Sequence, residues 1–471
     1  MIYIDIEDMT FYDDANVLVK SFYPRTEVAV LRADSVVTED DMIIKVTVPE
    51  KSLSKKESHN EFKKNLYIQL SKETGKTLPW GFLTGVRPSK IAYTMLEEGC
   101  TRKDILDEFT VKHLASEEKA LLALNVASTE KDILESLDYK NGYSLYIGIP
   151  FCPTTCLYCS FTSYSLASYK DKVDRYLDAL IKEMEYVSEL CKDKRLDTVY
   201  FGGGTPTTLE PYQLDRLLNA LYRLFPMENV RELTVEAGRP DSITADKLSV
   251  LRKYGVERIS INPQTMNDET LKIIGRRHSV AQVKEAYSLA RSMGFNNINM
   301  DIIMGLPGEG IREVENTLAQ IKELSPDSLT VHSLAIKRAA ALNIWRDKYK
   351  DMSFENSTEV MSLTEKYAKD MNLFPYYMYR QKNMAGNFEN VGYAVKDMEC
   401  IYNILIMEEK QTIMALGAGA STKIVLPDLN EDGNHLIERV ENVKDVKTYI
   451  ARIDEMIARK ERAVGKGFFS I

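Results

Sequence analysis

The chain has 471 residues, of which 44% are hydrophobic and 28% charged, and its formal net charge is −9. This length predicts two or three domains, and the composition is ordinary for a globular enzyme. The acidic balance and the lack of long Lys/Arg blocks argue against a nucleic-acid backbone as the main partner, and no apolar run approaches the roughly 18 residues of a membrane span.

The first 140 residues predict a separate α+β domain. Its start, Met1-Ile-Tyr-Ile-Asp-Ile-Glu-Asp8, is acidic and lacks the basic and then apolar order of a signal peptide, so we expect a cytoplasmic protein with reduced thiols. The Gly/Pro-punctuated segment Leu78–Pro88 is interpreted either as a docking or substrate-facing loop or as a plain turn between helices. The expected strands are Met1–Ile6, Val17–Phe22 and Ile43–Val48, and the expected helices are Glu57–Glu73 and Ser89–Glu98.

Between residues 143 and 345, β-rich runs alternate with helical segments such as Lys172–Leu190 and Val280–Met293. This order is typical of parallel strands with crossover helices. It predicts an α/β fold built on an open, six-stranded (β/α) partial barrel, with the active site at the carboxyl ends of the strands. The expected strands are Ser144–Ile149, Thr198–Phe201, Glu232–Glu236, Arg258–Ile261, Ile298–Met304 and Ser328–His332.

Residues 346–471 predict a smaller domain that closes the open side of the barrel. Helical periodicity covers Ser357–Asp370, and the run Leu416–Ser421 is rich in glycine. No internal repeat or low-complexity segment interrupts this part of the chain.

Three cysteines, Cys152, Cys156 and Cys159, follow the first predicted barrel strand at CxxxCxxC spacing. Three thiolates on one loop bind three irons of a [4Fe–4S] cluster and leave the fourth iron open, whereas electron-transfer clusters normally use four cysteines. An open iron can chelate S-adenosylmethionine (SAM). Zinc usually requires a fourth Cys or His at a paired spacing, and Cys100, Cys191 and Cys400 do not supply one. The loop therefore predicts radical chemistry.

Aromatic side chains flank this loop. Tyr158 precedes the last cysteine, where its ring either covers the cluster and stacks on an adenine or only packs. Tyr146 lies in the preceding strand, and because side chains alternate between the two faces of a strand, its ring faces either the cluster or the core.

The next strands also end in residues suited to a ligand. Gly202, Gly203 and Gly204 allow close approach of the backbone to the amino and carboxylate groups of a methionine moiety. Glu236 ends the third strand and is a candidate acceptor for ribose hydroxyls. Arg239 follows, either as a clamp for a substrate carboxylate or in a surface ion pair.

Three further polar residues belong to the fourth and fifth strands. Gln264 ends the fourth strand and Arg276 lies on the helix after it. Asp301 lies within an apolar strand, where an unpaired carboxylate is costly. We expect Asp301 to pair with Arg276 or with a ligand.

The motifs together resemble radical SAM enzymes of the oxygen-independent coproporphyrinogen III oxidase type, over residues 143 to about 425. The likeness extends over nearly the whole chain for the HemZ branch of that family. The motifs that carry it are the cysteine loop, Gly202-Gly-Gly-Thr-Pro206, Thr234-Val-Glu-Ala-Gly-Arg-Pro240, Gln264, Arg276, Asp301-Ile-Ile-Met-Gly-Leu-Pro307, Pro79-Trp-Gly-Phe-Leu-Thr-Gly-Val-Arg-Pro88 and Tyr379-Arg-Gln-Lys-Asn383.

The resemblance implies two cofactors, a [4Fe–4S] cluster and SAM. It implies that Cys152, Cys156 and Cys159 hold the cluster. Tyr146, Gly203, Glu236 and Ser421 would border the cluster-bound SAM, while Tyr158, Gly204, Thr205, Gln264, Arg276, Asp301 and Ala335 match positions of nucleoside binding, including a second SAM.

The reaction implied by the resemblance is oxidative decarboxylation of two propionates of coproporphyrinogen III to vinyls, which gives protoporphyrinogen IX in haem biosynthesis. A tetracarboxylate substrate should need cations at the barrel mouth, and the candidates are Arg239, Arg87, Arg380 and Lys382. The implied electron source is a small donor protein of the flavodoxin or ferredoxin type.

The sequence departs from the family pattern at three places. Gly148 stands where the oxidases carry a His, and Phe161 replaces an extra cysteine after the cluster motif. The HNxxYW-like segment of the oxidases and haem chaperones matches Tyr402–Met407 only at Asn403. Alternatives that stay open are a haem chaperone, an enzyme acting on another tetrapyrrole, such as anaerobic haem ring opening by methyl transfer, and a tRNA-modifying enzyme.

Overall fold

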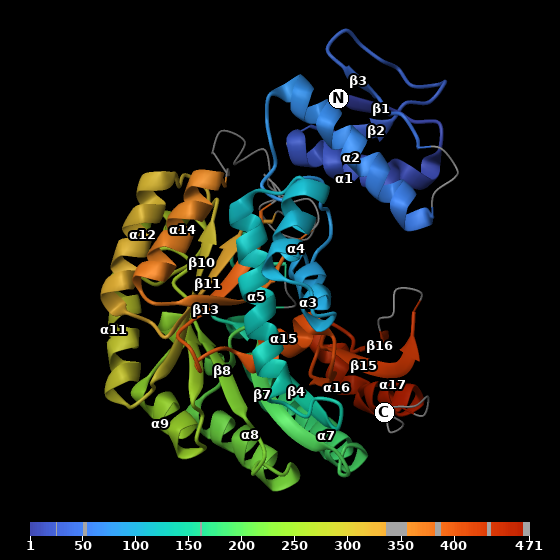
Figure 1. Ribbon diagram of the computed structural model, residues 1–471. Coiled ribbons are helices and arrows are strands. Elements are labelled where there is room, and N and C mark those ends of the chain that lie inside the picture. The colour runs from blue at the N-terminus through green and yellow to red at the C-terminus, as the bar shows by residue number, and fades with distance from the viewer. Residues whose placement is uncertain are drawn as a thin grey trace.

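A small three-stranded parallel sheet forms the amino-terminal part of the molecule. The computed structural model describes residues 1–24, 26–49, 54–160, 163–335, 356–381, 388–430 and 435–464. In it β1 (Ile2–Asp5) lies between β2 (Val28–Val30) and β3 (Met42–Lys45). The helices α1 (Tyr12–Phe22) and α2 (Lys55–Thr74) complete a core of residues 2–82 that is separate from the rest (Figure 1).

The strand predicted at Val17–Phe22 is wrong, because these residues form the second half of α1. Its buried side chains Ala15, Leu18, Val19 and Phe22 recur at helical spacing. A short run of β-branched and aromatic residues does not distinguish a strand from a buried helix face.

Helix α2 begins and ends where local signals place it. The Ser54 hydroxyl oxygen accepts a hydrogen bond from the Glu57 backbone amide, and the Glu57 carboxylate accepts one from the Ser54 backbone amide, which is a capping box. Gly75 closes the helix in the left-handed conformation. The predicted helix Glu57–Glu73 therefore matches the observed element closely.

Helices α3 (Ser89–Glu97), α4 (Arg102–Asp107) and α5 (Glu117–Glu135) follow and pack on the main core of the molecule. The fully buried Trp80 joins this layer to the strands, since its indole Nε1 donates to Glu389 at 2.6 Å. Much of the segment Leu78–Pro88 is therefore buried, and it connects the amino-terminal helices to the carboxyl-terminal strands.

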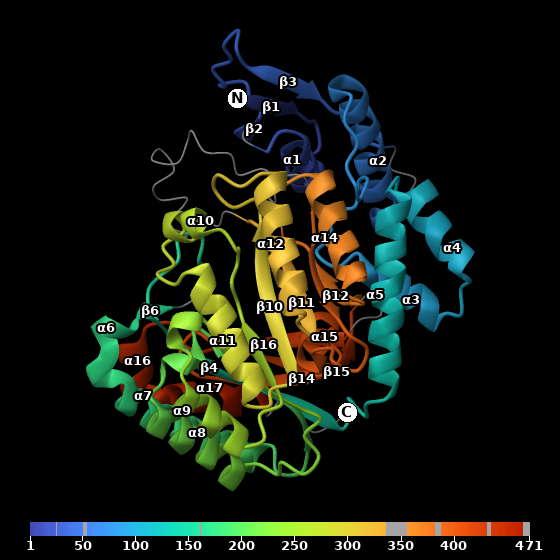
Figure 2. The same ribbon diagram turned by 90° about the vertical axis from the view of Figure 1, so that its left-hand side faces the viewer.

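Six parallel strands form the centre of a large open sheet, as predicted, and the fold class is α/β. The helices α7 (Val173–Leu190), α8 (Pro211–Leu224), α9 (Ala245–Lys253), α11 (Val280–Ser292) and α12 (Ile311–Leu324) cover its outer face (Figures 1 and 2). The strands are buried along nearly their whole length, which is typical of a parallel sheet. In sheet order they are β11 (Ser328–Ser333), β10 (Asn297–Met304), β9 (Arg258–Ile261), β8 (Glu232–Gly238), β7 (Arg195–Gly203) and β4 (Gly142–Ile149).

The carboxyl-terminal residues extend this sheet at both edges. Beyond β11 lie the antiparallel strands β13 (Asn390–Ala394) and β12 (Phe374–Tyr379), with α14 (Thr358–Asp370) outside them. Beyond β4 lie β14 (Thr412–Leu416), which is parallel to β4, and the antiparallel β15 (Ser421–Leu429) and β16 (His435–Glu441). The helices of this part are α15 (Ile401–Glu408), α16 (Val446–Ala451) and α17 (Ile453–Val464).

One hydrophobic core runs from Trp80 to Ala463 and unites the parallel strands with these additions. The division into 1–140, 143–345 and 346–471 stays a prediction. Across the described ranges, no helix combines the length and hydropathy that crossing a bilayer demands.

A buried pair of acids lies between α5 and α15. Glu130 is fully buried, and neither of its carboxylate oxygens has a hydrogen-bond partner among the described residues. Burial, and then the charge of Glu408, raise the pKa of Glu130 well above its usual value, although Arg87 opposes them. The folded state therefore holds this proton more tightly than the unfolded chain, and stability falls as pH rises above the unfolded pKa.

Glu130→Gln is expected to stabilise the protein by roughly 1–3 kcal/mol at pH 7.5, because no charge remains to desolvate. The gain should shrink toward pH 4.5, where the unfolded carboxyl is also protonated. Urea denaturation at both pH values measures this. The control Glu135→Gln removes an exposed carboxylate of the same helix that pairs with Lys131 at 2.6 Å, and it should change the free energy of unfolding by less than about 0.5 kcal/mol. A gain independent of pH would contradict the assignment.

Candidate functional site

The three cysteines of the CxxxCxxC motif lie on one loop at the carboxyl end of β4. Cys152 ends the short strand β5 (Phe151–Cys152), which pairs with β6 (Tyr164–Ser165). The Cys159 amide donates to the Cys156 carbonyl at 3.1 Å, and the Leu157 amide donates to the Ile274 carbonyl at 2.9 Å. The loop is thus held between β4 and the helix α10 (Asp268–Ile273).

The thiols of this loop are electrostatically coupled. All six cysteines lie in described ranges, and no two of them form a disulfide. The pKa of Cys152 is raised to about 11, chiefly by burial; the Thr205 hydroxyl, 3.5 Å from the sulfur, opposes this shift, and the charges of Cys156 and Cys159 add to it. A cation is therefore needed to hold three thiolates together.

The donor set fits a [4Fe–4S] cluster better than a single metal ion. Within the part of the chain that the structure describes, no three His, Cys, Asp or Glu side chains converge on one ion position. In an iron–sulfur cubane each thiolate binds a different iron, so the sulfurs need not converge. Three thiols on a loop at the mouth of the barrel meet that requirement.

Arg239 is part of the wall that supports the loop. It is 2% exposed, and its Nη1 donates to the carbonyl and the hydroxyl of Thr154 at 3.1 and 2.7 Å. Its Nε and Nη2 donate to the two carboxylate oxygens of Asp241 at 2.9 and 2.7 Å. The guanidinium thus binds Asp241 and the loop, and its role as a substrate clamp stays a prediction.

Arg276 and Tyr158 form a second wall beside the loop. Arg276 is buried and donates to the Asn262 carbonyl at 2.6 Å and to the Tyr158 hydroxyl at 3.2 Å. The ring of Tyr158 borders a small apolar cluster with Leu157 and Ile274. Both predicted nucleoside-binding residues therefore contact each other beside the cysteine loop.

The glycines at the carboxyl end of β7 bring the backbone close to the loop. The amides of Gly204 and Thr205 donate to the carbonyls of Ile149 and Phe151 at 2.8 and 2.7 Å. A Cβ at Gly204 would lie 2.6 Å from the Phe151 oxygen, and Gly203 has a φ of +107°. Only glycine fits this approach.

Three stacked tyrosines line the interior beside these glycines. Tyr146 stacks on Tyr200 and on Tyr402, with ring centroids 6.3 and 6.2 Å apart, and Tyr200 lies 4.6 Å from Tyr402. The ring of Tyr146 lies next to Gly202, and its contact with a cluster stays a prediction.

Glu236 is the titratable side chain beside these three tyrosines. It accepts a hydrogen bond from the Tyr200 hydroxyl at 2.6 Å. Burial raises the pKa of Glu236 to about 7, and the charge of Asp301 raises it too, while the Tyr200 hydrogen bond opposes both.

Asp301 does not pair with Arg276, the first of the two predicted partners, and its pairing with a ligand stays a prediction. One carboxylate oxygen of Asp301 accepts a hydrogen bond from the side-chain amide of Asn299 at 2.7 Å. The other carboxylate oxygen lies 3.9 Å from Nε2 of His332. Gln264 binds the backbone of the same strand: its amide donates to the Asp301 carbonyl at 2.9 Å, and its φ is +68°. The strand therefore satisfies Asp301 without an arginine.

The other predicted residues have no contact with the cysteine loop among the interactions of the described residues. The Ser421 hydroxyl donates to Glu441 at 2.6 Å at the start of β15, and Ala335 follows β11. Arg87 donates to the Met407 carbonyl and pairs with Glu409 at 3.3 Å.

Arg380 is 4% exposed and donates to the Leu83 carbonyl at 2.6 Å, with its guanidinium over the Trp80 ring. Arg87 and Arg380 thus both have internal partners, and their role as substrate clamps stays a prediction. Lys382 lies outside the described residues, as does Phe161.

Sequence reasoning missed Tyr200, Tyr402 and His332. Register was the available signal for Tyr200, which lies directly opposite Tyr146 in the β4–β7 pair. His332 lies on β11 two residues after the partner of Asp301, so alternation places both side chains on the same face.

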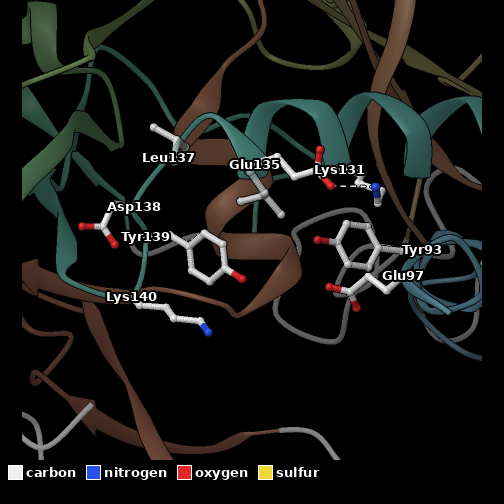
Figure 3. A pocket seen from close by; sticks show the side chains of 9 residues that line it. Tyr93, Glu97, Lys131, Glu135, Leu137, Asp138, Tyr139 and Lys140 are labelled. Carbon is white, nitrogen blue, oxygen red and sulfur yellow. Dashed lines mark hydrogen bonds and ion pairs between the residues drawn. The ribbon is translucent and has the colours of Figure 1, made fainter. Parts of the chain in front are cut away.

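A hollow elsewhere in the molecule is not part of this site. It lies between α3, α5 and the segment 137–140 (Figure 3), and its lining includes Tyr93, Glu97, Lys131 and Tyr139. This segment precedes the amino end of β4, whereas the cysteine loop follows its carboxyl end. At about 3.3 Å per residue, the strand separates the two by more than about 20 Å.

Comparison with known proteins agrees with this geometry. Residues 146–321 match the Radical SAM superfamily. The chain is 42% identical over 416 residues to the oxygen-independent coproporphyrinogen-III oxidase-like protein HemZ of Bacillus subtilis (strain 168), covering 87% of this chain and 82% of that protein.

Two further likenesses cover a smaller share of the chain. The heme chaperone HemW of Bacillus subtilis (strain 168) is 38% identical over 195 residues, 41% of this chain and 51% of HemW. The solved structure of the coproporphyrinogen III oxidase HemN from Escherichia coli superposes with a TM-score of 0.53 at 24% identity and covers 69% of this chain and 73% of that one.

Proposed function

Because the chain belongs to the radical SAM family of HemN- and HemZ-like proteins, we propose that it catalyses the oxidative decarboxylation of coproporphyrinogen III propionates to vinyls, giving protoporphyrinogen IX. The observation that carries the proposal is the loop of three coupled thiols beside the glycine turn at the barrel mouth. The proposal includes a cytoplasmic location and a flavodoxin- or ferredoxin-type protein as electron donor.

In this proposal Cys152, Cys156 and Cys159 hold the cluster. When bound, such a cluster supplies the electron that cleaves SAM reductively and so supplies hydrogen-atom abstraction. Gly202 and Gly203 leave room for the methionine moiety of SAM, and the Glu236 carboxylate accepts hydrogen bonds from its ribose hydroxyls. The wall of Tyr158 and Arg276 borders the nucleoside.

A second candidate function is radical chemistry on another tetrapyrrole. At position 148, where the oxidases resembled by this chain carry a His, a Cβ would already lie 3.1 Å from the Leu416 carbonyl and 3.3 Å from the Tyr146 ring. The packing of β14 against β4 therefore closes the space that such a side chain would need, and this favours a substrate contact different from that of the oxidases.

The test is an anaerobic assay of the cluster-reconstituted protein with SAM, dithionite, coproporphyrinogen III and an electron acceptor, read by mass spectrometry. Sequential loss of two carboxyl groups with formation of 5′-deoxyadenosine is the expected result. Formation of 5′-deoxyadenosine without decarboxylation would overturn the coproporphyrinogen assignment, and haem would then be the substrate to test. No 5′-deoxyadenosine from a fully reconstituted protein would overturn the radical SAM reading.

SAM affinity is expected to rise about tenfold between pH 6 and pH 8. The ionised carboxylate of Glu236 is the stronger acceptor for a ribose hydroxyl, and its pKa of about 7 means that the carboxyl is mostly protonated at pH 6 and mostly ionised at pH 8. Equilibrium dialysis with labelled SAM measures the dissociation constant. Glu236→Gln should weaken binding and remove this part of the pH dependence, which separates it from titration of SAM itself. An unchanged pH profile in the variant would contradict this role.

A further inference from the structure

A fully buried ion pair joins α7 to the carboxyl-terminal helix α17. Glu183 and Lys460 are both 0% exposed, and Lys460 Nζ donates to Glu183 Oε1 at 2.7 Å. Oε1 also accepts from the Asn442 side-chain amide at 2.8 Å, and Oε2 accepts from the Tyr449 hydroxyl at 2.6 Å. A buried ion pair is normally less stabilising than an apolar pair of similar volume. The other hydrogen-bond partners of Glu183 therefore indicate which part of the structure this ion pair holds in place.

The remaining partner of Glu183 is the glycine run Gly417–Gly419, which follows β14. The Gly417 amide donates to Glu183 Oε2 at 2.9 Å, and the Gly417 carbonyl accepts from the Asn442 side-chain amide at 2.9 Å. The Gly419 amide donates to the Val443 carbonyl at 2.9 Å. Gly417 and Gly419 have φ values of +101° and +74°, so this backbone has a shape that needs glycine.

The glycine run lies directly against the strand that leads to the cysteine loop. Leu416 pairs with Ile147 in the β14–β4 register. The Tyr176 hydroxyl, also on α7, donates to the Gly148 carbonyl at 2.6 Å and accepts from the Ala418 amide at 3.1 Å. A Cβ at Gly417 would lie 2.6 Å from both the Gly148 oxygen and the Tyr176 oxygen.

We propose that the Glu183–Lys460 ion pair is a positioning unit for the SAM site. The ion pair holds the glycine run against β4 at Gly148, which lies four residues before Cys152. It thereby sets the affinity for SAM. The inference rests on the proposed radical SAM function. It also assigns a role to α17, which lies beside α7 and far from the cysteine loop in sequence (Figure 1).

A carboxylate is suited to this role because it accepts from four donors on four different segments of the chain at once. With Lys460 removed, the charge of Glu183 would be buried without a cation, and the glycine run would shift with it. With both charges replaced by apolar side chains of similar size, the packing would persist while the Gly417 amide would lose its acceptor. Stability and SAM affinity should therefore separate in the double variant.

The experiment compares wild-type protein with Glu183→Leu/Lys460→Met in the reconstituted full-length chain. We expect a melting temperature close to that of wild type and a dissociation constant for SAM raised about 10- to 100-fold, the range in which misplacement by about 1 Å acts. Hydrogen exchange of the peptide that contains residues 416–421 should become faster. SAM-dependent 5′-deoxyadenosine formation without a tetrapyrrole gives KM and kcat, and the effect should fall mainly on KM.

Two further single variants test the same positioning role, one by removing a contact and one as a control. Tyr176→Phe removes only the hydroxyl between Gly148 and Ala418 and should raise the KM for SAM severalfold in a folded protein. The control Lys182→Ala breaks the exposed Lys182–Asp454 pair, 2.5 Å long, which joins the same two helices, and it should leave SAM affinity unchanged.

A folded double variant, or a folded Tyr176→Phe variant, that binds SAM as wild type does would overturn the positioning role. Failure of the wild-type chain to bind or cleave SAM would instead overturn the proposed function, so the two failures are distinguishable. Equal loss of affinity in Lys182→Ala would also overturn the inference, because helix contact alone would then explain the effect.

Discussion

Replacement of Cys156 by serine is expected to abolish cluster assembly and to reduce SAM cleavage by at least about 1,000-fold, the scale on which loss of an essential group acts. Cys156 lies at the centre of the loop, is 9% exposed, and is anchored by the Leu157 amide next to it. A serine hydroxyl is not a thiolate and does not replace the iron–sulfur bond. Two cysteines alone would leave the cluster with too few protein ligands.

Iron and sulfide content after anaerobic reconstitution, together with 5′-deoxyadenosine formation, measure this effect. Cys100→Ser is the matched control, because Cys100 lies in the turn after α3, outside the loop. It should retain wild-type iron content and activity. If Cys156→Ser assembled a complete cluster, the ligand assignment would have to pass to another side chain, and the loop would lose its proposed role.

The parallel strands were predictable because each is a short, nearly continuous apolar run followed by an amphipathic helix. The segment Val17–Phe22 failed for the opposite reason, since six residues do not reveal a helical period. The carboxyl-terminal strands were also beyond prediction, because β12 and β14 join opposite edges of the sheet and the sequence contains no signal for that partition.

The cysteine loop and the glycine turn were predictable because local spacing alone carries their chemistry. The arginines were not, because an arginine in sequence does not show whether its partner is a substrate or the chain itself. Arg239 bonds to Asp241 two residues away, whereas Arg380 reaches Leu83 across the fold. Glu183 and Lys460 are separated by 277 positions, and only the folded chain brings them together.

Gly204→Ala is expected to prevent productive SAM binding, with a loss of at least about 100-fold in affinity, and to destabilise the protein by about 1–3 kcal/mol. The new Cβ would lie 2.6 Å from the Phe151 oxygen and 2.9 Å from two other Phe151 backbone atoms. Backbone cannot rotate away as a flexible side chain can, so Phe151 must move. Cys152 follows Phe151 directly, and the clash is therefore transmitted to the first cluster ligand.

Equilibrium dialysis with SAM, iron content and the melting temperature test this expectation together. The control is Gly85→Ala, because a Cβ there meets nothing within 4 Å among the described residues and should leave SAM affinity unchanged. Gly204 has no positive φ, unlike Gly203 at +107°, so its effect is steric and not conformational. Wild-type SAM affinity in a folded Gly204→Ala protein would show that the loop adjusts without cost, and the close approach of β7 to the cysteine loop would then not determine the SAM site.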